Sequence, residues 1–233
     1  MRTWIKIDSI STFYESVKLI IKKVLMELED KITELEKTLA ELRRALEGAI
    51  QTLTIASDTR DPYTAGHQRR VADLAISIAQ EMGLPENVVA GIRMAGLIHD
   101  IGKLAVPAEI LSKPSKINDL EFQLVKTHPE VGYDILKNID FPWPVADIVL
   151  QHHERMNGSG YPRKLKRPDI IIEARIINVA DVVEAMASHR PYRPSLGIEK
   201  SLEQISKNRG ILYDDEVVDA CLRLFEEKGF KFK

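Results

Sequence analysis

The sequence contains a single cysteine, few aromatic residues and no long apolar run. With one cysteine, Cys221, among 233 residues, an intramolecular disulfide framework is excluded and a reducing compartment is expected. No apolar segment approaches the roughly 18 residues that a membrane-spanning helix needs. Residues 17–21 are too few, and too interrupted by lysine, for a signal peptide. The sequence therefore predicts a cytoplasmic protein with no membrane segment in this chain.

Neither sign of charge dominates the chain. The 33 Lys and Arg residues and 35 Asp and Glu residues leave a formal net charge of −2, which argues against general binding to DNA or RNA polymers. A local basic patch facing a small anionic substrate is compatible with this balance. Long alternations of polar and apolar residues are also absent, whereas apolar residues recur at helical spacing. The sequence therefore predicts an all-α fold.

A heptad repeat runs through the N-terminal part of the chain. Apolar residues recur in alternating steps of four and three, and no glycine or proline interrupts them before Gly48. This stripe is narrower than that of a helix packed on its own domain, although that alternative stays open. We therefore predict a parallel homodimeric coiled coil. Its seam comprises Ile21, Leu25, Leu28, Ile32, Leu35, Leu39, Leu42, Leu46, Ala49 and Leu53.

Two domains are predicted. Residues 1–56 would serve dimerisation and signal input, and residues 57–233 would carry the chemistry. Near the start of the second domain the pattern breaks at Asp61-Pro62, where Asp61 can cap a helix that has Pro62 at its first position. Helical spacing then recurs over residues 90–98, 121–136, 145–152, 170–186, 198–205 and 215–225, with loops expected around 107–118 and 157–168.

Histidine is the informative residue type of the second domain. Asp100 directly follows His99, and Asp181 lies in an apolar helix, where an unpaired carboxylate is costly to bury without a metal ion. Neighbouring helical residues point about 100° apart, so His99 and Asp100 cannot both face one narrow target. They can straddle a centre of two ions, in which Asp100 bridges both ions and His99 binds one of them. Mixed imidazole and carboxylate ligands suit iron, manganese or zinc more than calcium or magnesium. The six histidines are His67, His99, His128, His152, His153 and His189.

These residues belong to an ordered series of motifs. A bare His-Asp pair is a weak signal, whereas an ordered and spaced series is a specific one. On these motifs the chain, over roughly residues 50–226, resembles the HD-GYP family of the HD phosphohydrolase superfamily. The motifs are DPYTAGH ending at His67, HDIGK from His99 to Lys103, KTHPE with His128, HHERMNGSGYP from His152 to Pro162, ADVVEAM with Asp181, and SHRPYR from Ser188 to Arg193.

The resemblance implies a helical HD-type domain that holds two divalent transition-metal ions, with iron or manganese expected. It implies that a hydroxide activated by these ions hydrolyses a cyclic dinucleotide. Cyclic di-GMP would be the substrate, with linear pGpG or GMP as the product. The implied ligands are His67, His99, Asp100 and Asp181 for one ion, and Asp100, His128, His152 and His153 for the other.

The same resemblance implies the substrate contacts. Lys103 would bind a phosphate oxygen and offset the charge of the transition state, which makes it a catalytic residue beside Asp100. Tyr161, in the Gly-rich loop, would contact the nucleotide. Arg190 and Arg193 would contact guanine or phosphate, which guanidinium groups suit, although a structural pairing of one of them with a helix carboxylate stays open.

Three positions depart from the family's pattern. Members that bind a third metal carry a glutamate where this chain has Tyr63, which favours two metals here. Asn157 and Glu184 each replace an aspartate, and both positions can lie behind the metal ligands. Their change therefore puts efficiency or substrate preference in question rather than the number of ligands. His189 falls at a variable place and is expected on the surface.

Other functions stay open. Hybrid cyclic GMP-AMP is a second candidate substrate, because the phosphodiester chemistry is identical. A non-catalytic receptor that binds a cyclic dinucleotide and signals through its coiled coil is a different class, although degenerate receptors usually lose ligands. An HD nucleotidase acting on mononucleotides has no use for the GYP and RPYR segments. The chain is either a fragment of a longer sensor or takes its input at its own N-terminus.

Overall fold

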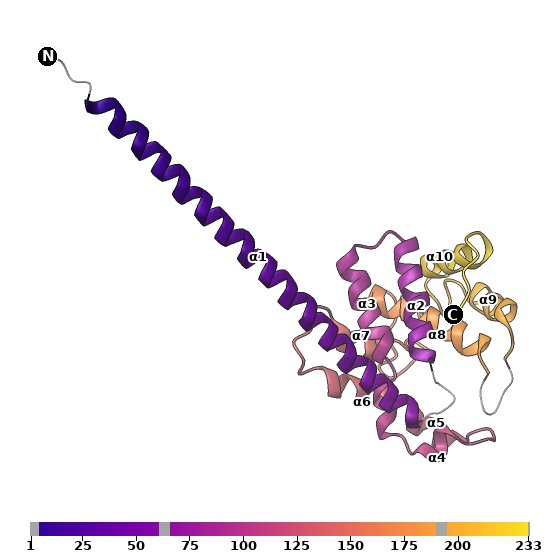
Figure 1. The fold of residues 1–233 in the computed structure, drawn as a ribbon. Helices are drawn as coiled ribbons and strands as arrows, with labels where there is room; N and C mark the ends of the chain where they lie inside the picture. Colours follow the sequence, from indigo (N-terminus) through magenta and orange to yellow (C-terminus); the bar gives the residue numbers. More distant parts are fainter. Residues whose placement is uncertain (1–4, 61–65, 190–194, 233) are drawn as a thin grey trace. The chain divides into compact units, whose positions relative to one another are not determined.

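The computed structural model describes residues 5–60, 66–189 and 195–232 (Figure 1). The chain divides into two compact units, Met1–Ala49 and Ile50–Lys233. The predicted Asp61-Pro62 cap lies outside the described residues, as do Tyr63, Arg190 and Arg193. Nothing in the structure therefore tests those four predictions.

The N-terminal unit consists of most of helix α1, Ile5–Arg60. A helix of 56 residues agrees with the absence of glycine and proline from most of this segment. The predicted seam is uncovered in the single chain: from Ile21 to Leu46 its isoleucine and leucine side chains are 46% to 68% exposed. None of the helices in the described residues is both long enough and apolar enough to cross a membrane.

The second unit is built from short helices, and its described residues form isolated β-bridges but no sheet, which confirms the predicted all-α fold (Figure 1). After the end of α1 the elements are α2 His67–Glu81, α3 Glu86–Ile98, the 3-10 helix η2 Ile101–Ala105, α4 Ala108–Leu111, α5 Asp119–Val125, α6 His128–Leu136, α7 Val145–Gln151, α8 Ile172–Ala187, α9 Ile198–Lys207 and α10 Asp215–Glu226.

Helix α8 lies at the centre of this unit. It packs against α2, α3, α7, α9 and α10, and its residues Ile176, Ile177, Val179 and Ala180 are fully buried. A helix that is apolar on nearly all sides is expected where other helices surround it. Asp181 follows this buried run directly, so the packing of α8 fixes the position of that residue.

The structure corrects the predicted helix 121–136. The run of α-helical hydrogen bonds is interrupted at Lys126-Thr127, where the N–H of Thr127 bonds to the carbonyl of Leu124, three residues back; this separates α5 from α6. Pro129 stands in the first turn of α6, where its missing N–H costs no hydrogen bond. The break places His128 at the N-terminus of α6. The loop predicted around 107–118 also contains the one-turn helix α4.

Candidate metal centre

The predicted metal ligands other than Asp181 lie at the ends of several helices, and all of them meet in one cluster. His67 begins α2, His128 begins α6, and the His152-His153 pair directly follows α7. His99 and Asp100 come between α3 and η2, and Asp181 lies within α8. Three overlapping groups have ligand atoms within 4.8 Å of one another: His67, His99 and Asp181; His99, Asp100 and His152; and His128, His152 and His153.

Three of these imidazole rings are oriented in the same way. The Nδ1 atom of His99 lies 2.8 Å from the carbonyl oxygen of Gly96, three residues earlier. His128 and His152 make the same contact at 2.7 Å and 2.5 Å. A carbonyl only accepts, so Nδ1 carries the proton in each neutral ring. The Nε2 lone pair is therefore left to face the cluster, which is the orientation a metal ligand needs.

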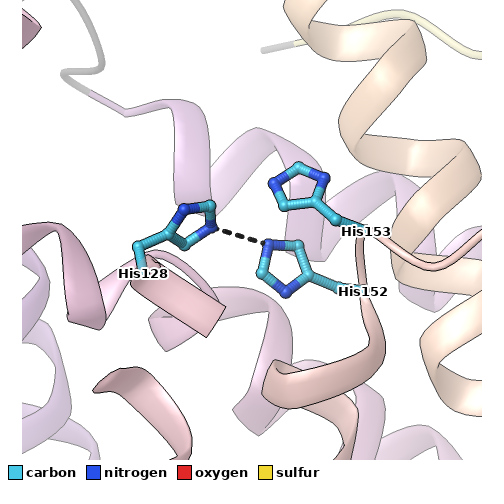
Figure 2. A group of neighbouring side chains, drawn as sticks. All are labelled: His128, His152 and His153. Carbon is cyan, nitrogen blue, oxygen red and sulfur yellow. Dashed lines mark hydrogen bonds between the residues drawn. The ribbon is translucent and has the colours of Figure 1, made fainter. Parts of the chain in front are cut away.

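The Nε2 atoms have no proton to share with one another. Figure 2 shows His128 and His152 facing each other, with their Nε2 atoms 3.2 Å apart and His153 beside them. The Nε2 atom of His99 is buried and has no hydrogen-bond partner in the described structure. Converging lone pairs and an unpaired buried nitrogen are costly in a metal-free protein, and a cation removes both costs. The residues present therefore fit a transition-metal site.

Asp100 lies between two histidine groups, His67 and His99 on one side and His128, with its neighbours His152 and His153, on the other. Its Oδ1 atom is 3.4 Å from Nε2 of His128. Its Oδ2 atom is 3.6 Å from Nε2 of His99 and 3.8 Å from Nε2 of His67. The two oxygens thus face different sets of ligands, as a bridging carboxylate requires. The ammonium group of Lys103 also contacts Oδ2, at 2.7 Å.

Gly102 allows the backbone of η2 to approach that of α6 closely. A Cβ atom on Gly102 would stand 1.9 Å from the carbonyl oxygen of His128 and 2.6 Å from the backbone nitrogen of Gly132. Only glycine fits at such a contact between two backbones. The glycine of the HDIGK motif is therefore what lets η2 lie directly on α6, with Asp100 beside His128.

The surroundings of His128, His152 and Asp100 shift their pKa values in the directions that favour cation binding. Burial lowers the pKa of His128 to about 4 and that of His152 to about 3, so both rings are neutral at pH 7. Burial acts to raise the pKa of Asp100, but Lys103 and the surrounding histidines outweigh it and hold this pKa well below its usual value. The cluster therefore presents neutral imidazoles and ionised carboxylates, the protonation states that metal binding needs.

A buried carboxylate supports His67 from behind. The Nδ1–H of His67 donates to Glu184, which is fully buried. Glu184 also accepts hydrogen bonds from Nε of Arg70 at 2.7 Å and from Oγ of Ser188 at 2.6 Å. These contacts leave Nε2 of His67 facing Asp181, whose Oδ1 lies 3.1 Å away. Sequence reasoning noted Glu184 as a departure but missed Arg70, whose position three residues after His67 was an available signal.

The Gly-rich loop is fixed by a second residue that sequence reasoning missed. The buried carboxylate of Glu154 accepts the backbone N–H groups of Arg163 and Leu165 at 2.7 Å and 2.9 Å. These bonds hold the loop so that the ring of Tyr161 lies 4.7 Å from that of His153. Asn157, the other departure, accepts the N–H of Ser159 and so stabilises the turn.

Three side chains mark where the cluster meets solvent. Those of His153, Asp181 and Lys103 are 18%, 13% and 16% exposed, whereas the side chains of His67 and Asp100 are at most 5% exposed. A substrate would approach from this side. His189 is exposed, as predicted.

Comparison with known proteins agrees with this geometry. A profile of the HD domain family matches residues 52–217. A cyclic di-GMP phosphodiesterase of Thermotoga maritima is 42% identical over 180 residues, 76% of this chain and 49% of that protein. The 3′3′-cGAMP-specific phosphodiesterase 3 of Vibrio cholerae is 36% identical over 159 residues, 68% of this chain and 35% of that protein. The chain thus spans half or less of the length of the curated relatives it matches.

The fold has a counterpart among solved structures. Bd1817, an HDG"Y"P protein from Bdellovibrio bacteriovorus, superposes with a TM-score of 0.58 at 19% identity, covering 69% of this chain and 51% of that one. This likeness concerns the fold alone. The family profile, the curated relatives and the motifs together show that the chain belongs to the HD domain family, in its HD-GYP branch.

Proposed function

We propose that this chain is a metal-dependent cyclic dinucleotide phosphodiesterase whose substrate is cyclic di-GMP. The observation that carries the proposal is the position of Asp100, whose two oxygens face separate histidine groups. Two divalent ions, iron or manganese, would bind there. When bound, such ions activate water as a nucleophile near neutral pH and polarise the phosphoryl oxygen. His67, His99 and Asp181 would hold one ion, and His128, His152 and His153 the other, with Asp100 between them.

Lys103 would neutralise charge on the phosphate. Its ammonium group lies 2.7 Å from Asp100 and on the side of the cluster that meets solvent. With 16% of its side chain exposed, its charge is only partly screened. The negative charge that develops on the phosphate oxygens during hydrolysis is therefore stabilised by a group already in place.

Tyr161 would contact a base. Its ring lies at 32° to that of His153, and the ammonium group of Lys126 stands 5.6 Å from its centre. An aromatic ring with a neighbouring cation suits a base attached to a phosphate. Arg190 and Arg193 stay proposed contacts on the strength of the motif alone.

The relatives support the substrate class but leave two substrates in competition. Cyclic di-GMP is favoured by the name of the Thermotoga maritima relative, and hybrid cyclic GMP-AMP by that of the Vibrio cholerae relative. The deciding experiment assays the purified protein, loaded with Fe²⁺ or with Mn²⁺, against both dinucleotides. We expect faster turnover of cyclic di-GMP, and a preference for cyclic GMP-AMP would overturn the assignment of substrate.

Asp100→Asn tests the catalytic centre. The substitution keeps the size of the side chain but removes the charge between the two histidine groups, and we expect turnover to fall on the order of 10³-fold. Asp147→Asn, an exposed aspartate on α7, is the matched control and should retain activity. A folded, metal-loaded wild-type protein that binds cyclic di-GMP without forming product would instead make the chain a receptor.

We also propose that α1 makes the chain a parallel homodimer and passes a signal to the catalytic domain. The exposed apolar seam of α1 supports dimerisation through this helix.

The proposed compartment is the reducing cytoplasm. In its favour, the chain has a single cysteine and so no disulfide of its own. That residue, Cys221, is fully buried, and burial raises the pKa of its thiol to about 12, so it is an inert part of the core.

A further inference from the structure

A cavity lies between α2, α3 and the C-terminal segment, and none of its lining residues is a predicted metal ligand. It encloses about 330 Å³. Four basic side chains line it, from Arg69, Arg70, Arg93 and Lys231, against the single acidic side chain of Asp73. Within a chain of net charge −2, this is a local excess of positive charge in a concave surface. Such a surface concentrates anions.

The arginines of this cavity differ from the others in the domain. Arg69 and Arg93 are exposed and have no hydrogen bond, ion pair or ring contact with any described residue. Elsewhere in the domain the described arginines contact a carboxylate, an amide or an aromatic ring. These are Arg155, Arg163, Arg167, Arg175, Arg209 and Arg223. The two guanidinium groups at the cavity are therefore available to a ligand.

The cavity also has an aromatic wall. Phe230 and Phe232 line it, with their rings 5.6 Å apart, and both pack on Phe225 of α10 at 5.1 Å and 6.0 Å. Glu81 at the end of α2 holds this segment in place, because it bonds both Arg223, at 2.8 Å, and Lys228. The wall is thus part of the packed domain.

We propose that this cavity binds a nucleotide, with its phosphates on Arg69, Arg93 and Lys231 and its base against Phe230 and Phe232. Guanidinium forks suit phosphate oxygens, and an aromatic ring suits the face of a base. The volume falls at the lower end of the range for small-molecule sites, which fits a mononucleotide. A purely anionic ligand would leave the aromatic wall without a partner. Arg70 is paired with Glu184, whose carboxylate offsets its charge, so it is not counted among the phosphate contacts.

The test is calorimetric titration of GTP into the full-length protein after metal removal with a chelator. Without metal, nucleotide binding through ions at the other site is eliminated, so the result is independent of the proposed phosphodiesterase activity. We expect saturable binding of GTP, with tripolyphosphate at least tenfold weaker and guanosine weaker still. Equal affinity for tripolyphosphate would overturn the nucleotide assignment, and absence of GTP binding at millimolar concentration would overturn the site.

Two variants locate the ligand. Arg93→Ala should weaken GTP binding about tenfold, as expected for one lost charged hydrogen bond. Phe232→Ala should weaken GTP binding while leaving tripolyphosphate binding unchanged. Lys116→Ala removes the same charge from an exposed position that does not line the cavity and should bind GTP like the wild type. Unchanged GTP affinity in both cavity variants would show that the ligand binds elsewhere and would overturn the proposal.

Discussion

Glu184 supports His67, one of the predicted metal ligands. It lies behind His67, accepts its Nδ1–H and is itself held by Arg70. A carboxylate in this position fixes the tautomer and orientation of a metal-binding histidine and raises its basicity. The glutamate that stands here in place of the family's aspartate is therefore a longer side chain, and it bonds directly to the predicted ligand His67.

Glu184→Gln should weaken metal binding by about 10- to 100-fold. The amide still accepts a hydrogen bond from His67, but it carries no charge to pair with Arg70 or to polarise the imidazole. Manganese affinity measured by calorimetry checks this, with Glu199→Gln on α9, an exposed position, as the control. Equal affinities in the two variants would mean that Glu184 only fills space.

The neutral histidines make the metal-free protein sensitive to acid. Burial lowers the pKa of His128 to about 4 and that of His152 to about 3, whereas an unfolded histidine titrates near 6.5. Between these values the unfolded chain binds more protons than the folded one, so the free energy of unfolding falls as pH falls below about 6.5. From pH 7 to pH 5 we expect a loss on the order of 1–2 kcal/mol per histidine.

Urea denaturation of the chelator-treated protein at several pH values measures this slope. His128→Asn should flatten it, because one buried titrating group is removed, whereas His189→Asn at an exposed position should not. A free energy of unfolding that does not change between pH 7 and pH 5 would contradict the buried neutral state of these rings.

The contact of η2 with α6 depends on Gly102. Replacing it with alanine would put a methyl group against the carbonyl oxygen of His128, and both backbones would have to separate. Gly102→Ala should therefore lower the free energy of unfolding by at least about 2–3 kcal/mol and weaken metal binding. Thermal denaturation and metal analysis measure the two effects.

Gly48→Ala is the matched control for this glycine. Gly48 lies within α1, and a Cβ atom there would meet nothing within 4 Å. Because alanine favours helix over glycine by up to about 1 kcal/mol, this variant should be as stable as the wild type or more so. Equal effects of the two substitutions would show that the approach of η2 to α6 is not tight.

The spacing of apolar residues predicted where helices lie better than it predicted where one helix ends and the next begins. Apolar spacing located α3, α7, α8, α9 and α10 to within a few residues, because each buries one continuous face. It predicted a single helix in place of α5 and α6, because the spacing of apolar residues continues across Lys126-Thr127. All the predicted ligands except Asp181 lie at helix ends, so the ligand residues were predicted from motifs and not from periodicity.

The supporting residues depend on contacts that no local pattern records. The hydrogen bond from Arg70 to Glu184 joins positions 114 residues apart. Asn178 donates to the carbonyl oxygen of His152 at 2.5 Å, across 26 residues. Motifs could therefore predict which side chains come together, and the structure was needed to show what holds them. Their role as metal ligands stays a prediction.

The uncovered seam of α1 predicts the oligomeric state of the chain. Leucine and isoleucine side chains about half exposed along a long helix are costly in water, and pairing two such helices buries them. We expect light scattering to give twice the monomer mass. Ile32→Asp combined with Leu39→Asp should give the monomer mass, because the four introduced carboxylates would face one another across the seam of a parallel pair.

The control introduces the same two aspartates on the outer face of the same helix. Lys37→Asp combined with Arg44→Asp lies at positions that face solvent in the heptad frame, so this variant should stay dimeric. Circular dichroism separates loss of pairing from loss of the catalytic domain, whose helices should persist in both variants. A wild-type protein that is monomeric at every concentration, or a seam variant that remains a dimer, would rule out the coiled coil as the dimer interface.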